Sequence, residues 1–175
     1  MAGVTRVLAD GAVTSAKILD GTIATGDLAS SVGNFGAWTA YTPTLTAATT
    51  NPVISGTGAY ANGTYAKIGR VVTGKCKIQF GSTGSAGSGA YSISLPVTAR
   101  AAATGEAGTN GYGYLYNGNT TIYVPIQALQ VTTTTVSLYY GATYNGAATI
   151  VTHSAPWAWI SNCAMEFQFQ YEAAS

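Results

Sequence analysis

Large apolar residues recur at every fifth position within the first thirty residues of the chain. This five-residue spacing, or register, lies within a ten-residue repeat, in which Asp10-Gly11 returns as Asp20-Gly21. Its apolar members are Leu8, Val13, Ile18, Ile23 and Leu28. A period of five matches neither a helix, at 3.6 residues, nor a strand face, at two, so one copy cannot bury these side chains. We predict a parallel homotrimeric stalk over residues 1–30, with the five side chains as its shared core; a disordered linker is the alternative.

After a Ser/Gly/Asn-rich joint at residues 31–37, the pattern changes to short apolar and aromatic runs separated by turn residues. The predicted strands cover residues 63–68, 71–80, 91–95, 112–116, 121–126, 128–131, 136–140, 157–160 and 163–171. Many short strands with turn signals between them are typical of a β-sandwich or jelly roll. We therefore predict that residues 38–175 form a single all-β head.

Two predicted strands alternate clearly and indicate which side chains form the core of the head. One face of the last strand is apolar, with Cys163, Met165, Phe167, Phe169 and Tyr171. Cys76 and Phe80 alternate in the same way with Lys75, Lys77 and Gln79. Such alternation indicates sheets that pack on one side only, and it predicts Phe80, Phe167 and Phe169 in the core. Cys76 and Cys163 fall at inward positions, which favours buried thiols over a disulfide.

The composition of the 175-residue chain narrows the range of partners. Charged residues make up 7 % and the formal net charge is +1, against about 25 % charged residues in ordinary soluble domains. A surface with so little charge suits a protein covered by identical subunits or by a large assembly, and it provides no field for nucleic acid or an anionic membrane. Arg6 and Asp10 interrupt any signal-like run, and no stretch approaches the ~18 apolar residues of a membrane span. We expect a soluble chain that does not insert into membranes.

Four motifs of the head, taken together, resemble a known family. They are W-x-x-Y-T-P-T-L-T from Trp38, G-x-Y-x-x-I-G from Gly63, G-S-G-A-Y-S-I-S-L-P-V from Gly87 and A-P-W-x-W from Ala155. The set resembles the β-rich domain of tailed-bacteriophage tail fibres and minor tail proteins, and the stalk resembles the repeats that precede such domains. The resemblance covers nearly the whole chain. It implies a homotrimeric virion appendage, assembled in the host cytoplasm, that can bind a receptor and has no catalytic residues.

The head offers few groups for catalysis. All three Asp residues lie in the stalk, so the carboxylates of the head are Glu106, Glu166 and Glu172, and its one imidazole is His153. Glu166 and Glu172 would lie about 20 Å apart along a strand, beyond the ~5 to 9.5 Å of a glycosidase pair. A Ser-His-acid triad is neither indicated nor excluded. One His and two inward Cys give no metal-ligand spacing, so we expect no enzyme, cofactor or metal, and His153 is predicted to lie in a loop or at the surface.

Two sets of residues could bind a partner. Tyr112, Tyr114, Tyr116 and Tyr123 would share one face of a hairpin around Asn117-Gly118, while Leu115, Ile122 and Val124 would share the other. The tyrosine face would be either a subunit contact or a place where sugars stack. The weaker candidate is the basic set Lys67, Arg70, Lys75 and Lys77, which could meet an anionic polymer but more often would be a solvated strand face.

The leading hypothesis is a homotrimeric phage fibre whose N-terminus joins other virion proteins, on the tail or the capsid, and whose head contacts the host surface, for which a cell-surface glycan is the expected ligand. A capsid-attached head fibre or decoration protein is the first alternative. A free carbohydrate-binding module is the second, and the stalk argues against it.

Overall fold

A computed structural model describes residues 37–102, 109–141 and 147–174, which contain ten strands and no helix. In chain order the strands are β1 (Thr39–Tyr41), β2 (Leu45–Ala47), β3 (Tyr60–Ile68), β4 (Val71–Gln79), β5 (Tyr91–Ser94), β6 (Thr109–Asn117), β7 (Ile122–Gln130), β8 (Thr135–Tyr140), β9 (Thr149–Ile150) and β10 (Cys163–Glu172). The prediction of an all-β head is therefore confirmed. The predicted stalk core, Leu8, Val13, Ile18, Ile23 and Leu28, lies outside the described residues, and so does Glu106.

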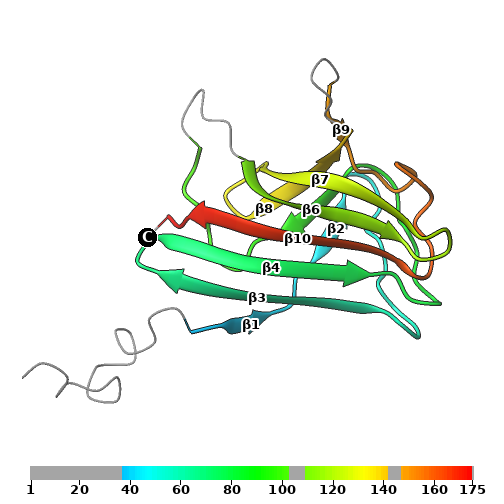
Figure 1. Ribbon diagram of the computed structural model, residues 1–175, viewed down its shortest axis with the longest axis horizontal. Coiled ribbons are helices and arrows are strands. Elements are labelled where there is room, and N and C mark those ends of the chain that lie inside the picture. Colours follow the sequence, from blue (N-terminus) through cyan, green and yellow to red (C-terminus); the bar gives the residue numbers. More distant parts are fainter. Residues whose placement is uncertain (1–36, 103–108, 142–146, 175) are drawn as a thin grey trace, which may run out of the picture. The chain divides into compact units, whose positions relative to one another are not determined.

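The strands form one continuous antiparallel sheet. Its order is β1-β3-β4-β10-β6-β7-β8-β5-β2, with β9 beside β8. Figure 1 shows that the sheet curls, so that β8, β5 and β2 lie behind β10 and β6. The two halves of a sandwich are thus parts of a single hydrogen-bonded sheet, which wraps around its own core as half of a barrel would. No helix that could span a membrane occurs in the described part of the chain.

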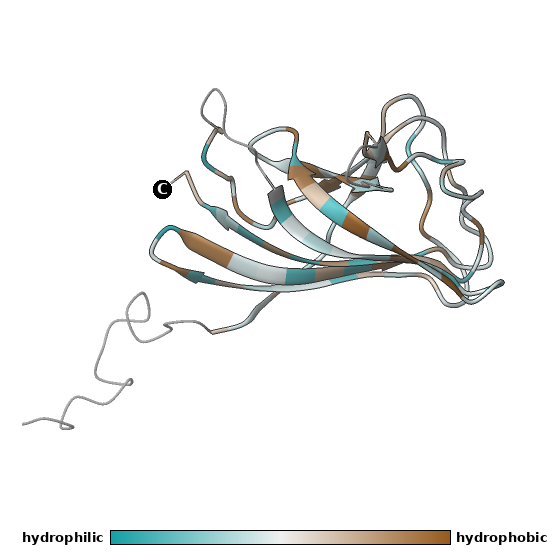
Figure 2. Cartoon of the chain, turned by 45° about the horizontal axis from the view of Figure 1, so that its top comes forward, coloured by the Kyte–Doolittle hydropathy of each residue, from teal (hydrophilic) through white to brown (hydrophobic). Residues whose placement is uncertain are grey.

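The core fills the inside of this curl. Phe80, Phe167 and Phe169 are all buried, as the alternation predicts, and they belong to one apolar cluster that takes side chains from both halves of the sheet. Figure 2 shows hydrophobic and hydrophilic residues alternating along the long strands. Cys76 and Cys163 are buried and free, which confirms the prediction of thiols. Burial of large apolar side chains is the main driving force for such a fold.

Several strand predictions need correction. Residues 157–160 are not a strand: the Trp159 ring fills the core from a loop, with its centroid 5.6 Å from that of Phe80, and its Nε1 donates to the Thr152 carbonyl at 2.8 Å. The two strands predicted at 121–126 and 128–131 are one strand, β7, because its backbone pairs without a break from Ile122 to Gln130. Strands β1, β2 and β9 were not predicted, and each has only two or three residues.

Candidate binding surface

Six of the predicted contact residues lie on one side of the sheet: Tyr112, Tyr114, Tyr116, Tyr123, Lys75 and Lys77. We call this side the outer face: the side of β3, β4, β10, β6 and β7 that points away from the core. The antiparallel register lines its residues into rows that cross the strands. The first row is Tyr60, Gln79, Ala164, Tyr116 and Tyr123; the second is Asn62, Lys77, Glu166, Tyr114 and Pro125; the third is Thr64, Lys75, Gln168, Tyr112 and Gln127.

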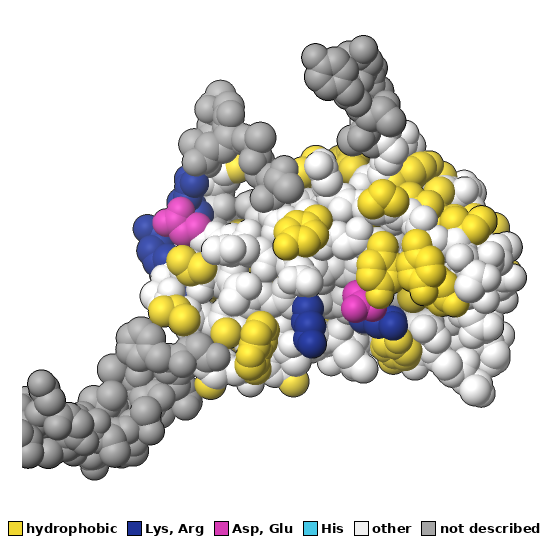
Figure 3. Space-filling view, in the orientation of Figure 1, with side chains coloured by type: hydrophobic (Ala, Val, Ile, Leu, Met, Phe, Trp, Pro, Cys, Tyr) yellow, Lys and Arg dark blue, Asp and Glu magenta, His cyan; other side chains and the backbone are white. Residues whose placement is uncertain are grey.

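Three of the four predicted tyrosines touch one another on the outer face. The ring centroid of Tyr123 lies 5.3 Å from that of Tyr114 and 4.7 Å from that of Tyr116. We call these three residues the tyrosine cluster. Tyr123 is 60 % exposed. Figure 3 looks onto this face and shows hydrophobic side chains gathered beside an acidic and basic pair. Each aromatic contact of this kind is worth about 0.5 to 1.5 kcal/mol beyond the area it buries.

The hairpin geometry explains why the cluster forms. Strands β6 and β7 are joined by a four-residue loop at 118–121, and Tyr116 pairs directly with Tyr123. On the opposite side Leu115 is buried and Val124 packs against the core, as predicted. Ile122 is predicted on that apolar side as well, but it is the first residue of β7 and its side chain is exposed. Tyr112 stands apart from the cluster, in the third row, and is 68 % exposed.

A chain of polar contacts links the tyrosine cluster to the neighbouring strands. Tyr114 Oη donates to Glu166 Oε2 at 2.8 Å, and Lys77 Nζ lies 3.3 Å from the same oxygen. Lys77 Nζ also lies 5.6 Å from the centre of the Tyr60 ring. The hydrogen bond to Tyr60 is the main cause that raises the pKa of Lys77, and the hydrogen bond to Glu166 raises the pKa of the Tyr114 hydroxyl. The pair is half-exposed, and such pairs contribute at most about 1 kcal/mol to stability.

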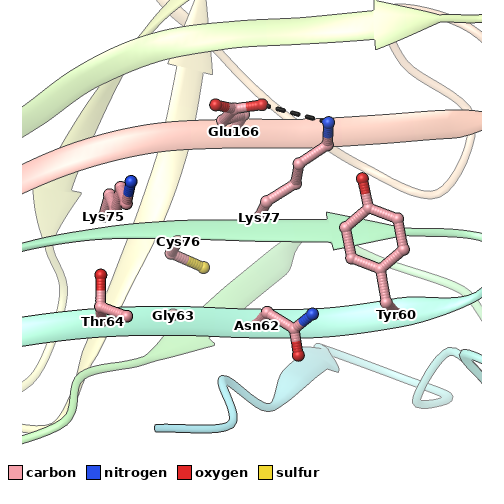
Figure 4. Close-up of a pocket in the computed structure, with 8 residues that line it drawn as sticks. All are labelled: Tyr60, Asn62, Gly63, Thr64, Lys75, Cys76, Lys77 and Glu166. Atoms are coloured by element: carbon pink, nitrogen blue, oxygen red, sulfur yellow. Dashed lines mark ion pairs between the residues drawn. The ribbon is translucent and has the colours of Figure 1, made fainter. Parts of the chain in front are cut away.

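Beside this ion pair the outer face has a shallow hollow of about 260 Å³, drawn in Figure 4. Its polar and aromatic lining comes from Tyr60, Asn62, Thr64, Lys75, Lys77 and Glu166. Because Glu166 pairs with Lys77, the cation left in the hollow is Lys75, which has no ion pair among the residues that the structure describes. The sequence did not indicate Tyr60, Asn62 or Glu166 as part of a binding surface, because they come together only through the strand order β3-β4-β10.

The four basic candidates lie at two places. Lys75 and Lys77 are on the outer face, whereas Lys67 and Arg70 lie beside the turn between β3 and β4. Arg70 Nη2 is 3.1 Å from Glu172 Oε1, and the Nε of Arg100 is 2.6 Å from the other oxygen of that carboxylate. Arg70 and Lys77 therefore already have an acidic partner. The four basic residues therefore do not form the continuous cationic surface that would bind an anionic polymer.

The polar groups considered for catalysis have structural partners. His153 is half-buried in the loop after β9, where its Nδ1 accepts a hydrogen bond from the Gly89 backbone at 3.0 Å. Glu166 and Glu172 belong to the same strand and pair with different basic residues. No group of three or more His, Cys, Asp or Glu side chains that could hold a metal occurs in residues 37–102, 109–141 and 147–174. What the outer face offers is binding by stacking and hydrogen bonds.

The comparisons with known proteins add no relative to this picture. No family model, no curated protein and no solved structure matches the chain.

Proposed function

We propose that the chain is a fibre protein of a bacteriophage virion, a homotrimer with an N-terminal stalk, whose β-rich head contacts a glycan of the host surface. The observation that supports the host contact is the tyrosine cluster, in which three rings pack together on the outer face, away from the core. Aromatic side chains gathered on a surface usually mark a contact site. The resemblance of the head motifs and of the stalk repeat supports the assignment to a virion fibre.

A glycan suits this surface better than a second subunit does. Tyrosine offers a flat apolar ring with a hydrogen-bonding tip, which is what a sugar ring and its hydroxyls need. Glu166 and Lys77 lie directly beside the cluster, with 37 % and 39 % of their side chains exposed. Charged residues are depleted from the cores of protein interfaces, so an exposed ion pair next to the rings favours a polar ligand that leaves the pair in water.

The test replaces Tyr116 and Tyr123 with Ser in the full chain and measures three properties of the product: its attachment to host cells, the mass of the assembly and the thermal stability of the assembly. We expect attachment to fall while the mass of the assembly stays unchanged. Thermal stability should fall modestly, because the contacts of the Tyr123 ring with Tyr114 and Tyr116 are lost. The control is Val53→Ser with Val131→Ser, which removes two exposed apolar side chains outside the cluster. If the mass of the assembly falls instead and attachment is kept, the cluster is a subunit contact and the proposed host contact is wrong.

A further inference from the structure

Four hollows follow one another across the outer face along its third row. Thr64 and Lys75 line both the first hollow and the second, Gln168 lines the second and the third, and Tyr112 lines the third and the fourth. Each hollow shares a lining residue with the next, so they form a row of adjoining hollows, which we call the cross-strand groove. It runs from Thr64 on β3 to Tyr139 on β8, and five strand spacings of about 4.8 Å give it a length of about 24 Å.

The side chains of the groove match a ligand rich in hydroxyl groups. Tyr112, which is 68 % exposed, separates a hollow of about 330 Å³ from one of about 430 Å³. The residues that line these two hollows carry no charge, and they include the amides of Gln168 and Gln127. An amide both donates and accepts, as a sugar hydroxyl does. At the β3 end the exposed ring of Trp38 lines the second hollow.

A buried acceptor without a partner among the described residues belongs to a residue that lines the same groove. Asn110 is only 6 % exposed and lines the hollow beside Tyr112, yet its Oδ1 accepts no hydrogen bond from the residues that the structure describes. It lies at an irregularity of the pairing of β6 with β7, between Thr109 and Gly111. Irregularities of this kind re-aim side chains and are frequent beside functional sites. Because a buried acceptor left unpaired is costly, this oxygen would gain from a hydrogen bond that a ligand in the groove donates.

We infer that the cross-strand groove binds a linear, hydroxyl-rich polysaccharide, with one sugar ring stacked on Tyr112 and a hydroxyl of the chain donating to Asn110 Oδ1. A length of about 24 Å across six strands suits an extended polymer better than a single sugar. The inference rests on the proposed function only in taking a glycan as the ligand of the outer face. The residues that it uses, Tyr112, Asn110, Gln168 and Gln127, are not those of the tyrosine cluster.

The experiment measures binding of the purified full chain to neutral polysaccharide extracted from the host envelope, cut into fragments and separated by length. We expect affinity to rise from single sugars to fragments of several sugars. Tyr112→Ser should lower the affinity for long fragments about tenfold, as expected when one aromatic contact and its covered area are lost. Gln127→Ala, at an exposed position, should weaken binding without disturbing the fold, and Asn110→Ala should weaken it as well.

The Val53→Ser with Val131→Ser variant serves as the control, because both side chains are exposed and neither residue lines any of the four hollows. It should bind the fragments as the native chain does. If Tyr112→Ser and Gln127→Ala both bind like the native chain, the inference is overturned, while the proposed host contact is judged separately by the attachment of the cluster variant. If Tyr112→Ser lowers the mass of the assembly rather than the affinity, the groove is a contact with a second copy and the inference is again overturned.

Discussion

Phe167 lies in the middle of β10 with its ring in the core, at a centroid distance of 6.0 Å from the ring of Phe169. Truncating such a ring removes its burial and leaves a cavity, so Phe167→Ala should lower the free energy of unfolding by about 3 to 5 kcal/mol. Denaturation by urea measures the change. Gln170→Ala, at an exposed position of the same strand, should change it by no more than about 0.5 kcal/mol. Equal small effects of the two substitutions would contradict the assignment of the inward face.

Two buried groups that ionise only at high pH, the Cys76 thiol and the Tyr171 hydroxyl, make the stability of the head depend on pH at the alkaline end. Burial raises the pKa of the Cys76 thiol from 9.0 to about 12, and it raises the pKa of Tyr171 from 10.0 to about 12. Above pH 9 the unfolded chain loses protons that the folded chain keeps, so unfolding is favoured as the pH rises. The free energy of unfolding should therefore be constant with respect to these groups up to about pH 9 and fall between pH 9 and pH 12.

Denaturation at a series of pH values tests this, with Cys76→Ala as the informative variant. It should show a smaller fall between pH 9 and pH 12 than the native chain, since only the unfolded thiol of the native chain ionises at the start of that range. Tyr171→Phe should keep the fall that begins near pH 9. A native curve that stays level to pH 12 would contradict the burial of both groups.

At the scale of the elements, β6 and β10 approach each other so closely that Gly113 is required. A Cβ atom at this position would overlap the carbonyl oxygen of Glu166 and the backbone of Phe167 on β10. Gly113→Ala should therefore move the two central strands apart and destabilise the head by about 1 to 3 kcal/mol or more. Thermal unfolding measures the loss.

Gly69→Ala provides the matched control for this substitution. Gly69 lies in the turn between β3 and β4 at a φ of +58°, with nothing within 4 Å of an added Cβ. Its cost should come from the left-handed backbone alone, about 1 to 2 kcal/mol, with the outer face left as it is. Separation of β6 from β10 should also weaken the contact between Tyr114 and Glu166, so only Gly113→Ala should alter attachment. A variant at Gly113 that behaves like the one at Gly69 would contradict the close approach.

The elements show what the hydrophobic pattern can and cannot predict. It placed β4 and β10 and their inward faces, because alternation along a strand is a local property. The tyrosine cluster was largely predictable for the same reason, since a hairpin joins neighbouring segments of sequence. By contrast, Trp159 enters the core from a loop, and its apolar surroundings in the sequence look like those of a strand.

The larger part of the binding surface could not be predicted in this way. The groove depends on β10 lying between β4 and β6, so that Gln168 meets Lys75 on one side and Tyr112 on the other. These three residues are far apart in sequence, and alternation fixes the face of each strand but not the order of the strands. The unpaired Oδ1 of Asn110 likewise arises from an irregularity in strand pairing that the sequence did not indicate.

At the scale of the whole molecule, the two sides of the sheet in the described head differ in composition. The inner side holds the core, and the outer side carries exposed tyrosines, amides and few charges. A net charge of +1 gives the molecule little long-range attraction for any partner. The proposed binding to a host surface would therefore have to come from many short-range contacts, and the multivalency of the proposed trimer would increase the strength of attachment without any new contact.

We predict that the chain forms a trimer through the five-residue register of its stalk. Light scattering of the purified chain should give three times the mass of one chain. Ile18→Asp together with Ile23→Asp should dissociate the assembly, since each substitution would bring three carboxylates into one layer of the shared core, where unpaired charges cost several kcal/mol. The control is Ser15→Asp with Thr25→Asp, which adds the same charges at positions outside the apolar register and should leave the mass unchanged. A native chain with the mass of a monomer, or equal effects of the two pairs of substitutions, would show that the register does not form the core of a trimeric stalk.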